Sequence, residues 1–384
     1  MKNDSSSQNK SSPLNTFQLI NKIEKTELEN CKNASSFLQS AMWGKFKSLF
    51  GWSAKSFLIE WSFNEKRENA PLLVLYRRLA PGFSFAYVPW GPHLPPFFPC
   101  DVKPQAMRQL AKKLKTFFAF NTVFIRFEPP WFNEDEKWEE AQSKEKKEFV
   151  TAGFKKSAAT VQPPDTVIIS LSASCEELLA MMKPKWRYNI TLAGKKGVQV
   201  NIGTEKDLEI FYSLLKETAI RDGIAVHNIN YYKTLYELCV SKEPCVSKET
   251  REKKENLSIR LYTASHEGDT LAAIIVLFYG KEAVYLYGAS SNIKRNLMAP
   301  YALQWRAMQD AKENGCLYYD LFGIPPFEDP KHPMAGLYRF KTGFGGRIIH
   351  RPGSWDYAYK PFFYTLFNFA EALRKKLMNL KKKR

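Results

Sequence analysis

Two stretches of the chain concentrate basic side chains without acidic neighbours. Between residues 181 and 200 there are five basic residues and no acid, namely Lys183, Lys185, Arg187, Lys195 and Lys196. Cationic side chains at this density suit contacts with phosphates. The alternative is a basic helix face that is simply solvated, and the residues alone leave both interpretations open.

The second basic stretch is residues 361–384. Phe and Leu recur there at helical spacing, and the part from Arg374 to Arg384 holds seven basic residues without an acid. Cations at the end of a helix are favoured by the helix dipole. The segment predicts an amphipathic helix. It either packs on a domain and leaves a solvated tail, or docks on an anionic membrane leaflet.

The whole chain shares this bias, with a formal net charge of +18 over 384 residues. Such a charge predicts a polyanionic partner: nucleic acid, a phosphorylated substrate or a membrane surface. The length fits two domains, and residues 1–13 predict a disordered leader. No run approaches about 18 apolar residues, and no apolar signal region follows Lys2. We therefore expect a cytoplasmic protein, at most peripheral on the inner face of the membrane.

Strand and helix patterns occur twice in a similar order, which predicts two α/β units. In the first unit we expect strands at 56–63, 72–78, 85–88 and 122–127 with helices at 37–50 and 107–120, and in the second unit strands at 166–171, 257–264, 270–279, 283–287 and 316–321 with helices at 207–221 and 299–314. The strands at 270–279 and 283–287, followed by the helix at 299–314, resemble an N-acyltransferase core of the GNAT kind.

No cofactor or metal is expected. In an acyl-CoA-dependent enzyme the loop before the last of these helices is rich in glycine, so that backbone N–H groups can cradle the pyrophosphate. Residues 289–300 hold no glycine, which disfavours acetyl-CoA. The six cysteines form no CxxC pair and the five histidines do not gather near them, so neither a zinc site nor a disulfide framework is expected.

A set of short motifs resembles the FemABX peptidyltransferases. In chain order they are Phe37-Leu-Gln-Ser with Trp43, Lys183-Pro-Lys-Trp-Arg-Tyr-Asn-Ile, Tyr285-Leu-Tyr-Gly-Ala-Ser, Ala299-Pro-Tyr-Ala-Leu-Gln, Tyr319-Asp-Leu-Phe-Gly and Leu337-Tyr-Arg-Phe-Lys-Thr-Gly-Phe-Gly. Each motif is weak alone, but the ordered set runs from about residue 37 to 345 and is specific.

The resemblance implies two tandem GNAT-like domains. Some members of the family carry a coiled-coil arm in the second domain, but the stretch between Gly223 and Leu257 has no heptads, so no arm is expected here. The first domain would span 14–165 and be completed by 350–384, and the second would span 166–349. The resemblance also implies that an amino acid passes from aminoacyl-tRNA to the stem-peptide amine of a peptidoglycan precursor, which builds the interpeptide bridge. The precursor is lipid II or UDP-MurNAc-pentapeptide. The basic residues at 183–196 would then bind the tRNA backbone.

Roles for single residues follow from the same motifs. Lys341 matches the lysine of the family's Phe-Lys pair, beside Phe340, and is expected to stabilise the oxyanion. A lysine outside such a motif would more often be exposed on a strand. Glu128 either orients the incoming amine or takes its proton, or it is a strand-end carboxylate paired with Arg126 or a nearby lysine. Asp320 is a candidate for capping the loop at Gly323.

Acceptor binding is expected of Lys47, His227, Tyr231 and Tyr287. His227 stands where a relative that uses the soluble precursor has an arginine. A histidine is only partly charged at neutral pH, and this mildly favours lipid II over the UDP-linked acceptor. Two alternatives stay open: tRNA-dependent transfer to another amine, on a protein N-terminus, a lipid or a polysaccharide, and a non-catalytic basic protein that binds RNA or a membrane.

Overall fold

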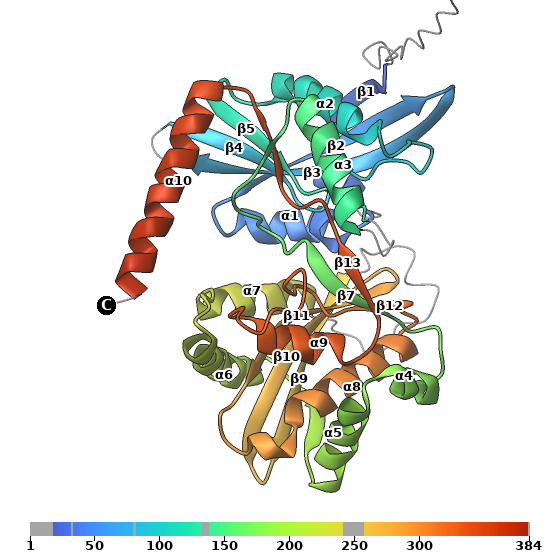
Figure 1. The fold of residues 1–384 in the computed structure, drawn as a ribbon, viewed down its shortest axis with the longest axis vertical. Helices are drawn as coiled ribbons and strands as arrows, with labels where there is room; N and C mark the ends of the chain where they lie inside the picture. The colour runs from blue at the N-terminus through green and yellow to red at the C-terminus, as the bar shows by residue number, and fades with distance from the viewer. Residues whose placement is uncertain (1–17, 32–33, 80–81, 133–137, 241–256, 383–384) are drawn as a thin grey trace, which may run out of the picture.

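The computed structural model describes residues 18–31, 34–79, 82–132, 138–240 and 257–382. The expected leader at 1–13 lies outside these residues. Two seven-stranded sheets, one above the other in Figure 1, form the two halves of the molecule. The mixed α/β class with two α/β units, expected from the sequence, is confirmed.

The first sheet is an antiparallel run followed by one parallel step. Its strands, in spatial order, are β1 (Ile20–Thr26), β2 (Ser53–Phe63), β3 (Lys66–Leu79), β4 (Phe83–Val88), β5 (Thr122–Phe127), β14 (Trp355–Ala358) and β6 (Lys155–Lys156). Pairing is antiparallel from β1 to β4 and parallel between β4 and β5. One face packs on α2 (Lys103–Leu114) and α3 (Trp138–Thr151). The other face meets α1 (Ala41–Ser48) and the second half of the molecule.

The second sheet repeats this plan. Its strands, in spatial order, are β13 (Arg347–His350), β7 (Asp165–Ser170), β12 (Tyr318–Asp320), β11 (Glu282–Ser290), β10 (Asp269–Tyr279), β9 (Leu257–His266) and β8 (Gln199–Ile202). α5 (Pro184–Lys195) and α8 (Ala299–Glu313) contribute to the core on one face, with α4 (Cys175–Met181) and α9 (Ala335–Thr342) alongside. α6 (Asp207–Asp222) and α7 (Ile229–Cys239) cover the other face, which shares one core with the first sheet.

A bulge in β11 places neighbouring tyrosines on opposite faces of the second sheet. Tyr285 pairs with Val276 and Tyr287 with Ile275, so Leu286 is the extra residue. Without the bulge, residues two apart would share a face. β11 also pairs with β12 only from Glu282 to Val284, and beyond that point the pairing ends. This opening between two parallel strands is where the site lies.

Two local expectations are wrong. The helix expected at 37–50 is interrupted, because Ser40 has an extended backbone and its hydroxyl accepts a hydrogen bond from the amide of Trp43 at 3.1 Å, starting a new helix. Phe37–Gln39 form a separate 3₁₀ turn. The strand-surface alternative for Lys341 is also wrong, since Lys341 lies near the end of helix α9 and is buried.

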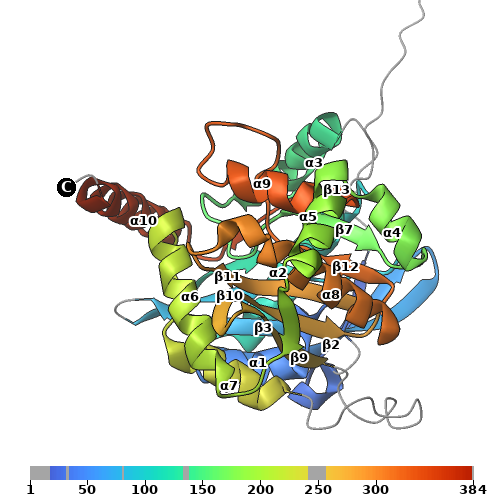
Figure 2. The ribbon, with the colours of Figure 1, turned by 90° about the horizontal axis from the view of Figure 1, so that it is seen from below.

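The chain ends in α10 (Pro361–Lys382), which follows β14. In Figures 1 and 2 its last turns extend beyond the body of the molecule. Among the described residues, no helix combines the length and the apolar character that crossing a bilayer requires.

Candidate active site

Lys341 occupies the opening between β11 and β12. Its side chain donates hydrogen bonds to the carbonyls of Phe322 (3.1 Å) and Gly323 (2.9 Å), and its Nζ lies 5.2 Å from the centre of the Tyr285 ring. Lys341 is only 5% exposed. An ammonium has three N–H donors, so these two carbonyls leave one N–H for a substrate. Burial lowers the pKa of Lys341 to about 7, and the charge of Asp320 opposes this change.

Asp320 shapes the turn that holds Lys341. Its Oδ1 accepts hydrogen bonds from the Phe322 amide at 2.7 Å and from the Thr166 hydroxyl. These contacts fix Phe322 in a left-handed backbone conformation, with φ of 58°. The two carbonyls that bind Lys341 belong to this turn. Asp320 therefore positions Lys341 both through the backbone and through its negative charge.

The basic motif at 183–187 supports α9 from outside. The Trp186 indole donates a hydrogen bond to the Phe340 carbonyl at 2.9 Å, and the Lys183 amide donates to the Gly343 carbonyl at 2.9 Å. A Cβ at Gly343 would lie 2.1 Å from the Trp186 ring, so only glycine permits this contact. Phe340 packs its ring on Tyr301 at 5.2 Å and so helps to hold α9 in place.

Glu128, at the end of β5, is saturated with hydrogen bonds. Its carboxylate accepts from the Tyr87 hydroxyl, from Ser354 at 2.7 Å, and from the amides of Val161 at 2.8 Å and Gln162 at 3.1 Å. Burial raises the pKa of Glu128, and these hydrogen bonds oppose the rise. The arrangement ties the end of β5 to two connections between the sheets.

Pairing with Arg126, one of the alternatives left open for Glu128, is wrong. The Arg126 guanidinium instead forms two buried bonds to Asp356 of β14, of 2.7 and 2.8 Å. Arg126 and Glu128 are on the same strand two residues apart, but β14 brings a carboxylate directly opposite Arg126. A bidentate pair of this geometry outcompetes a single contact.

Lys47 lies among aromatic rings where α1 meets α7. Its Nζ is 5.3 Å from the centre of the Tyr231 ring and 6.0 Å from that of Trp52. In the part of the chain that the structure describes, no carboxylate lies within ion-pair distance of Lys47. Burial, with a smaller effect of the charge on Arg77, lowers the pKa of Lys47 to about 8. A cation so placed attracts an anion.

His227, Tyr231 and Tyr287 adjoin Lys47 as expected from the sequence. The imidazole of His227 stacks on Tyr231 with ring centres 3.9 Å apart, and Tyr231 is hydrogen-bonded to Tyr287 of β11. Burial and the charge of Lys47 lower the pKa of His227, so the ring is mostly neutral at neutral pH. Burial holds the pKa of Tyr287 well above its ordinary value.

Arg77 joins this cluster and was not anticipated from the sequence. Its guanidinium stacks on Trp52 at 5.4 Å, and the same ring faces Lys47. Arg77 comes near the end of β3, on the same side of the strand as the buried Leu75. The side chain is exposed, and no acidic partner accompanies it among the described residues. The cluster therefore has a permanent guanidinium, although position 227 is a histidine.

A second arginine was also missed. Arg351, in the crossing between β13 and β14, is buried with its guanidinium 4.2 Å from the centre of the Trp90 ring. Its Nε and one terminal nitrogen find no hydrogen-bond partner among the described residues, nor does Oδ2 of Asp320. Burial lowers the pKa of Arg351, and Asp320 opposes this. Asp320 thus faces cations from two elements.

The five basic residues at 183–196 do not form one patch. Lys183, Lys185 and Arg187 lie at the start of α5, whereas Lys195 and Lys196 lie at its far end, about 18 Å away along the helix axis. Arg187 donates hydrogen bonds to the carbonyls of Ala180 (3.0 Å) and Met182 (2.8 Å), so part of its hydrogen-bonding capacity is already satisfied within the fold. The lysines are exposed.

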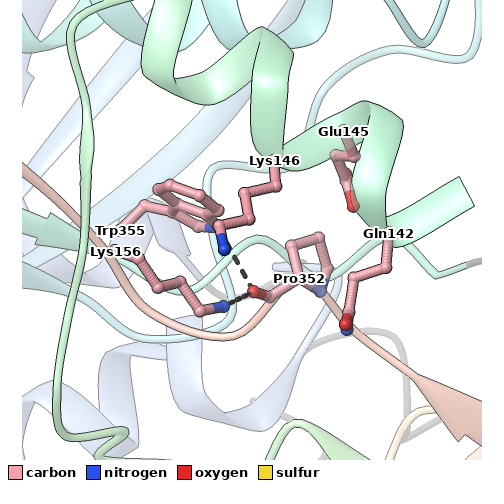
Figure 3. A pocket seen from close by; sticks show the side chains of 6 residues that line it. All are labelled: Gln142, Glu145, Lys146, Lys156, Pro352 and Trp355. Atoms are coloured by element: carbon pink, nitrogen blue, oxygen red, sulfur yellow. Dashed lines mark hydrogen bonds between the residues drawn. The ribbon is translucent and has the colours of Figure 1, made fainter. Parts of the chain in front are cut away.

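A separate cavity of about 140 Å³ lies between α3 and the crossing segment (Figure 3). It is lined by Gln142, Glu145, Lys146, Lys156, Pro352 and Trp355, none of which was singled out in the sequence. Lys156 and the Trp355 indole both donate to the Pro352 carbonyl, the latter at 3.2 Å. These two hydrogen bonds stabilise the fold of the crossing segment. Among the described residues no group of His, Cys, Asp or Glu side chains is arranged to hold a metal.

Comparison with known proteins places this geometry in a family. The sequence profile of the FemAB family matches residues 22–242 and 240–372. The chain belongs to the FemAB family. A lipid II:glycine glycyltransferase of Staphylococcus aureus is 25% identical over 385 residues, covering 86% of this FemAB chain and 89% of the relative. The Staphylococcus epidermidis enzyme of the same name is 25% identical over 283 residues, covering 61% and 67%.

Among solved structures, that of FemX superposes on this FemAB chain with a TM-score of 0.72. The match covers 90% of this chain and all of FemX, at 18% sequence identity. The two chains therefore share the same two-domain fold.

Proposed function

We propose that this FemAB chain transfers an amino acid from aminoacyl-tRNA to the stem-peptide side-chain amine of lipid II, building the interpeptide bridge. The observation that carries the proposal is the geometry at Lys341, a buried cation held by two carbonyls with one N–H left over. The names of the relatives, which are lipid II:glycine glycyltransferases, support the acceptor.

The reaction is aminolysis of an ester. The neutral amine of the acceptor forms a bond to the ester carbon, and the carbonyl oxygen becomes an oxyanion. The bond to the ribose oxygen then breaks, and the proton lost by the amine ends on that oxygen. An ammonium fixed at the oxyanion stabilises this charge strongly, because the surroundings of Lys341 exclude water. Two carbonyl contacts hold the ammonium in place before the substrate arrives.

The acceptor's pyrophosphate would bind at Lys47 and Arg77. These are two cations on one aromatic platform without a carboxylate partner among the described residues. Arginine grips phosphate with a rigid fork, a role that the mostly neutral His227 cannot fill. Tyr287 and Tyr285 lie on the same strand on either side of the bulge, so β11 links the pyrophosphate cluster to Lys341.

The aminoacyl-tRNA would approach over the start of α5. Lys183 and Lys185 are exposed there, and Trp186 of the same turn is bonded to α9 directly beside Lys341. Backbone phosphates would contact these lysines without reading sequence. Lys195 and Lys196 would reach a different part of the RNA, because the length of α5 separates the two groups.

The test is transfer of radiolabelled amino acid from charged tRNA to lipid II in detergent, with glycyl-, alanyl- and seryl-tRNA as donors. Lys341→Met should abolish most of the transfer while the thermal unfolding temperature stays the same or rises, since a buried amine is removed. Lys206→Met, at an exposed lysine of the second domain, is the matched control. Absence of transfer with every donor, to lipid II and to UDP-MurNAc-pentapeptide alike, would refute the proposal.

A further inference from the structure

Helix α10 carries two distinct apolar faces, and only one of them is covered. The covered face consists of Phe363, Tyr364 and Phe367, whose rings pack on the first domain. Tyr364 and Phe367 contact Phe124 of β5, with ring centres 5.3 and 5.2 Å apart. The Tyr364 hydroxyl also donates to Asp356 at 3.0 Å. The first two turns therefore fix the direction of the whole helix.

The second face, which we call the apolar stripe, is exposed. Its members and their exposed fractions are Phe362 (75%), Leu366 (54%), Phe369 (68%), Leu373 (49%) and Leu377 (53%). Successive helical residues turn by about 100°, which places these five within an arc of about 80° and along about 22 Å of helix. Phe363, Tyr364 and Phe367 fall outside this arc. The stripe is thus a continuous ridge that begins in the first turn of α10 and continues along the helix; Figures 1 and 2 show how the last turns of this helix extend beyond the body.

Charged residues are distributed around the stripe in a specific way. Lys376 flanks it on one side and Arg374 on the other, and both are exposed. Glu371 lies opposite the stripe, where it pairs with Arg374 at 2.8 Å. The segment from Arg374 to Arg384 carries seven basic residues and no acid. An apolar ridge bordered by cations, with the acid on the far side, is the pattern of a helix that lies in a membrane interface.

We propose that α10 docks this chain on an anionic lipid bilayer, with the apolar stripe between the headgroups and the cations over the lipid phosphates. The inference rests on the proposed function in one respect, since a lipid-linked acceptor requires the site to work beside a membrane. Charge favours a bilayer over a second copy as the occupant of the stripe. Pairing two copies would bring together chains of net charge +18 each, whereas anionic lipid neutralises that charge.

Flotation of the full chain with lipid vesicles tests the proposal without any turnover. The protein should float with phosphatidylcholine vesicles that contain about one-third phosphatidylglycerol, and much less with pure phosphatidylcholine. Raising the salt to about 1 M, where the Debye length is about 3 Å, should weaken the association. Failure to float with the anionic vesicles would overturn the inference.

Two variants distinguish binding through the apolar stripe from non-specific hydrophobic binding to the vesicles. The double variant Phe369→Ser with Leu373→Ser should lower the partition coefficient by about tenfold or more, because two apolar side chains no longer enter the interface. Ile220→Ser removes an apolar side chain of 84% exposure from α6 and should leave the partition unchanged. All these positions are exposed, so thermal unfolding should not change. Equal flotation of the double variant and the parent chain would refute a role for the stripe.

Two further readouts complete the test. Light scattering during size-exclusion chromatography should show a monomer; a dimer that the double variant abolishes would mean that a second copy covers the stripe, and would overturn the membrane proposal. The double variant should keep full transfer to lipid II in detergent micelles. If the parent chain floats with anionic vesicles but transfers no amino acid, the proposed function alone is refuted. If it transfers the amino acid but does not float, the docking alone is refuted.

Discussion

Lys341 offers a sharp prediction because its pKa lies near neutrality. Burial lowers this pKa to about 7, so about half of the side chains are charged at pH 7 and about one tenth at pH 8. The charged form has an N–H for the oxyanion, whereas the neutral form donates its two N–H groups to the carbonyls of Phe322 and Gly323 and has a lone pair left. Whether the contribution of Lys341 to activity falls or rises with pH therefore tells whether its charged or its neutral form is active.

If the ammonium is the active form, its contribution to kcat/KM should fall roughly tenfold per pH unit above 7. The acceptor amine must itself lose a proton, which gives the raw profile an opposing slope. Lys341→Arg removes this ambiguity, because an arginine stays charged throughout the range. The ratio of parent to Lys341→Arg activity cancels the titration of the substrate and should decline from pH 6 to pH 9.

Asp320→Asn provides a second test of the titration of Lys341. Asparagine keeps an oxygen for the Phe322 amide, but the negative charge that raises the pKa of Lys341 is lost. The decline in the activity ratio should therefore begin at a lower pH. Arg351 and Glu282 also face Asp320 and will relax to some degree. A ratio that rises with pH would show that the neutral amine accepts a proton, and a flat ratio would show that Lys341 does not titrate in this range.

Three other substitutions test the remaining parts of the site. Arg77→Ala should raise KM for lipid II by roughly 10- to 100-fold with little change in kcat, because a charge-assisted bond to phosphate is lost. Arg78→Ala, on the opposite side of β3, should leave both KM and kcat unchanged. Glu128→Gln should lower the free energy of unfolding in urea by about 1–3 kcal/mol, since one of its four donors loses its acceptor; an activity loss without this destabilisation would restore Glu128 as a base. Gly343→Ala should cost about 1–3 kcal/mol of stability, because the added Cβ would collide with the Trp186 ring. Gly336→Ala inside α9, the helix that Gly343 caps, should be neutral or stabilising, since a Cβ there meets nothing within 4 Å.

The elements that periodicity alone could predict are those with long apolar repeats. Strands β2, β4, β5 and β9–β11 and helices α6 and α8 lie within about three residues of their expected ranges, and β3 starts six residues before its expected range. α7 and α9 were not anticipated. The buried residues of α7 belong to the core that is shared with the first sheet, and α9 is eight residues long with Lys341 as its buried residue. The strands β13 and β14 were missed for a related reason, since each is four residues long and gains its partners from distant parts of the chain.

Some residues of the candidate site could also be predicted from the sequence, and others could not. The motifs pointed to Lys341, Lys47, Tyr231 and Tyr287, and the structure gathers the last three around one cluster. Arg77 resembled an ordinary surface cation at a strand end, and only the Trp52 ring, more than twenty residues away in sequence, reveals its neighbourhood. This contact continues the pairing of β2 and β3, in which Ser53 lies opposite Tyr76, whereas the contact of Lys47 with Tyr231 depends on the packing of α1 against α7. Neither the strand register nor that packing is fixed by a local pattern.

The insertion of β14 between β5 and β6 has a consequence for the order in which the protein forms. During synthesis the ribosome releases residues 20–156, which supply six of the seven strands of the first sheet, long before Trp355–Ala358 appear. Until then Arg126 lacks Asp356, and an unpaired guanidinium in that position opposes closure of the core. The second domain, by contrast, is complete at His350. The domain that begins first is therefore expected to finish last, and chaperones would meet it with an open sheet edge.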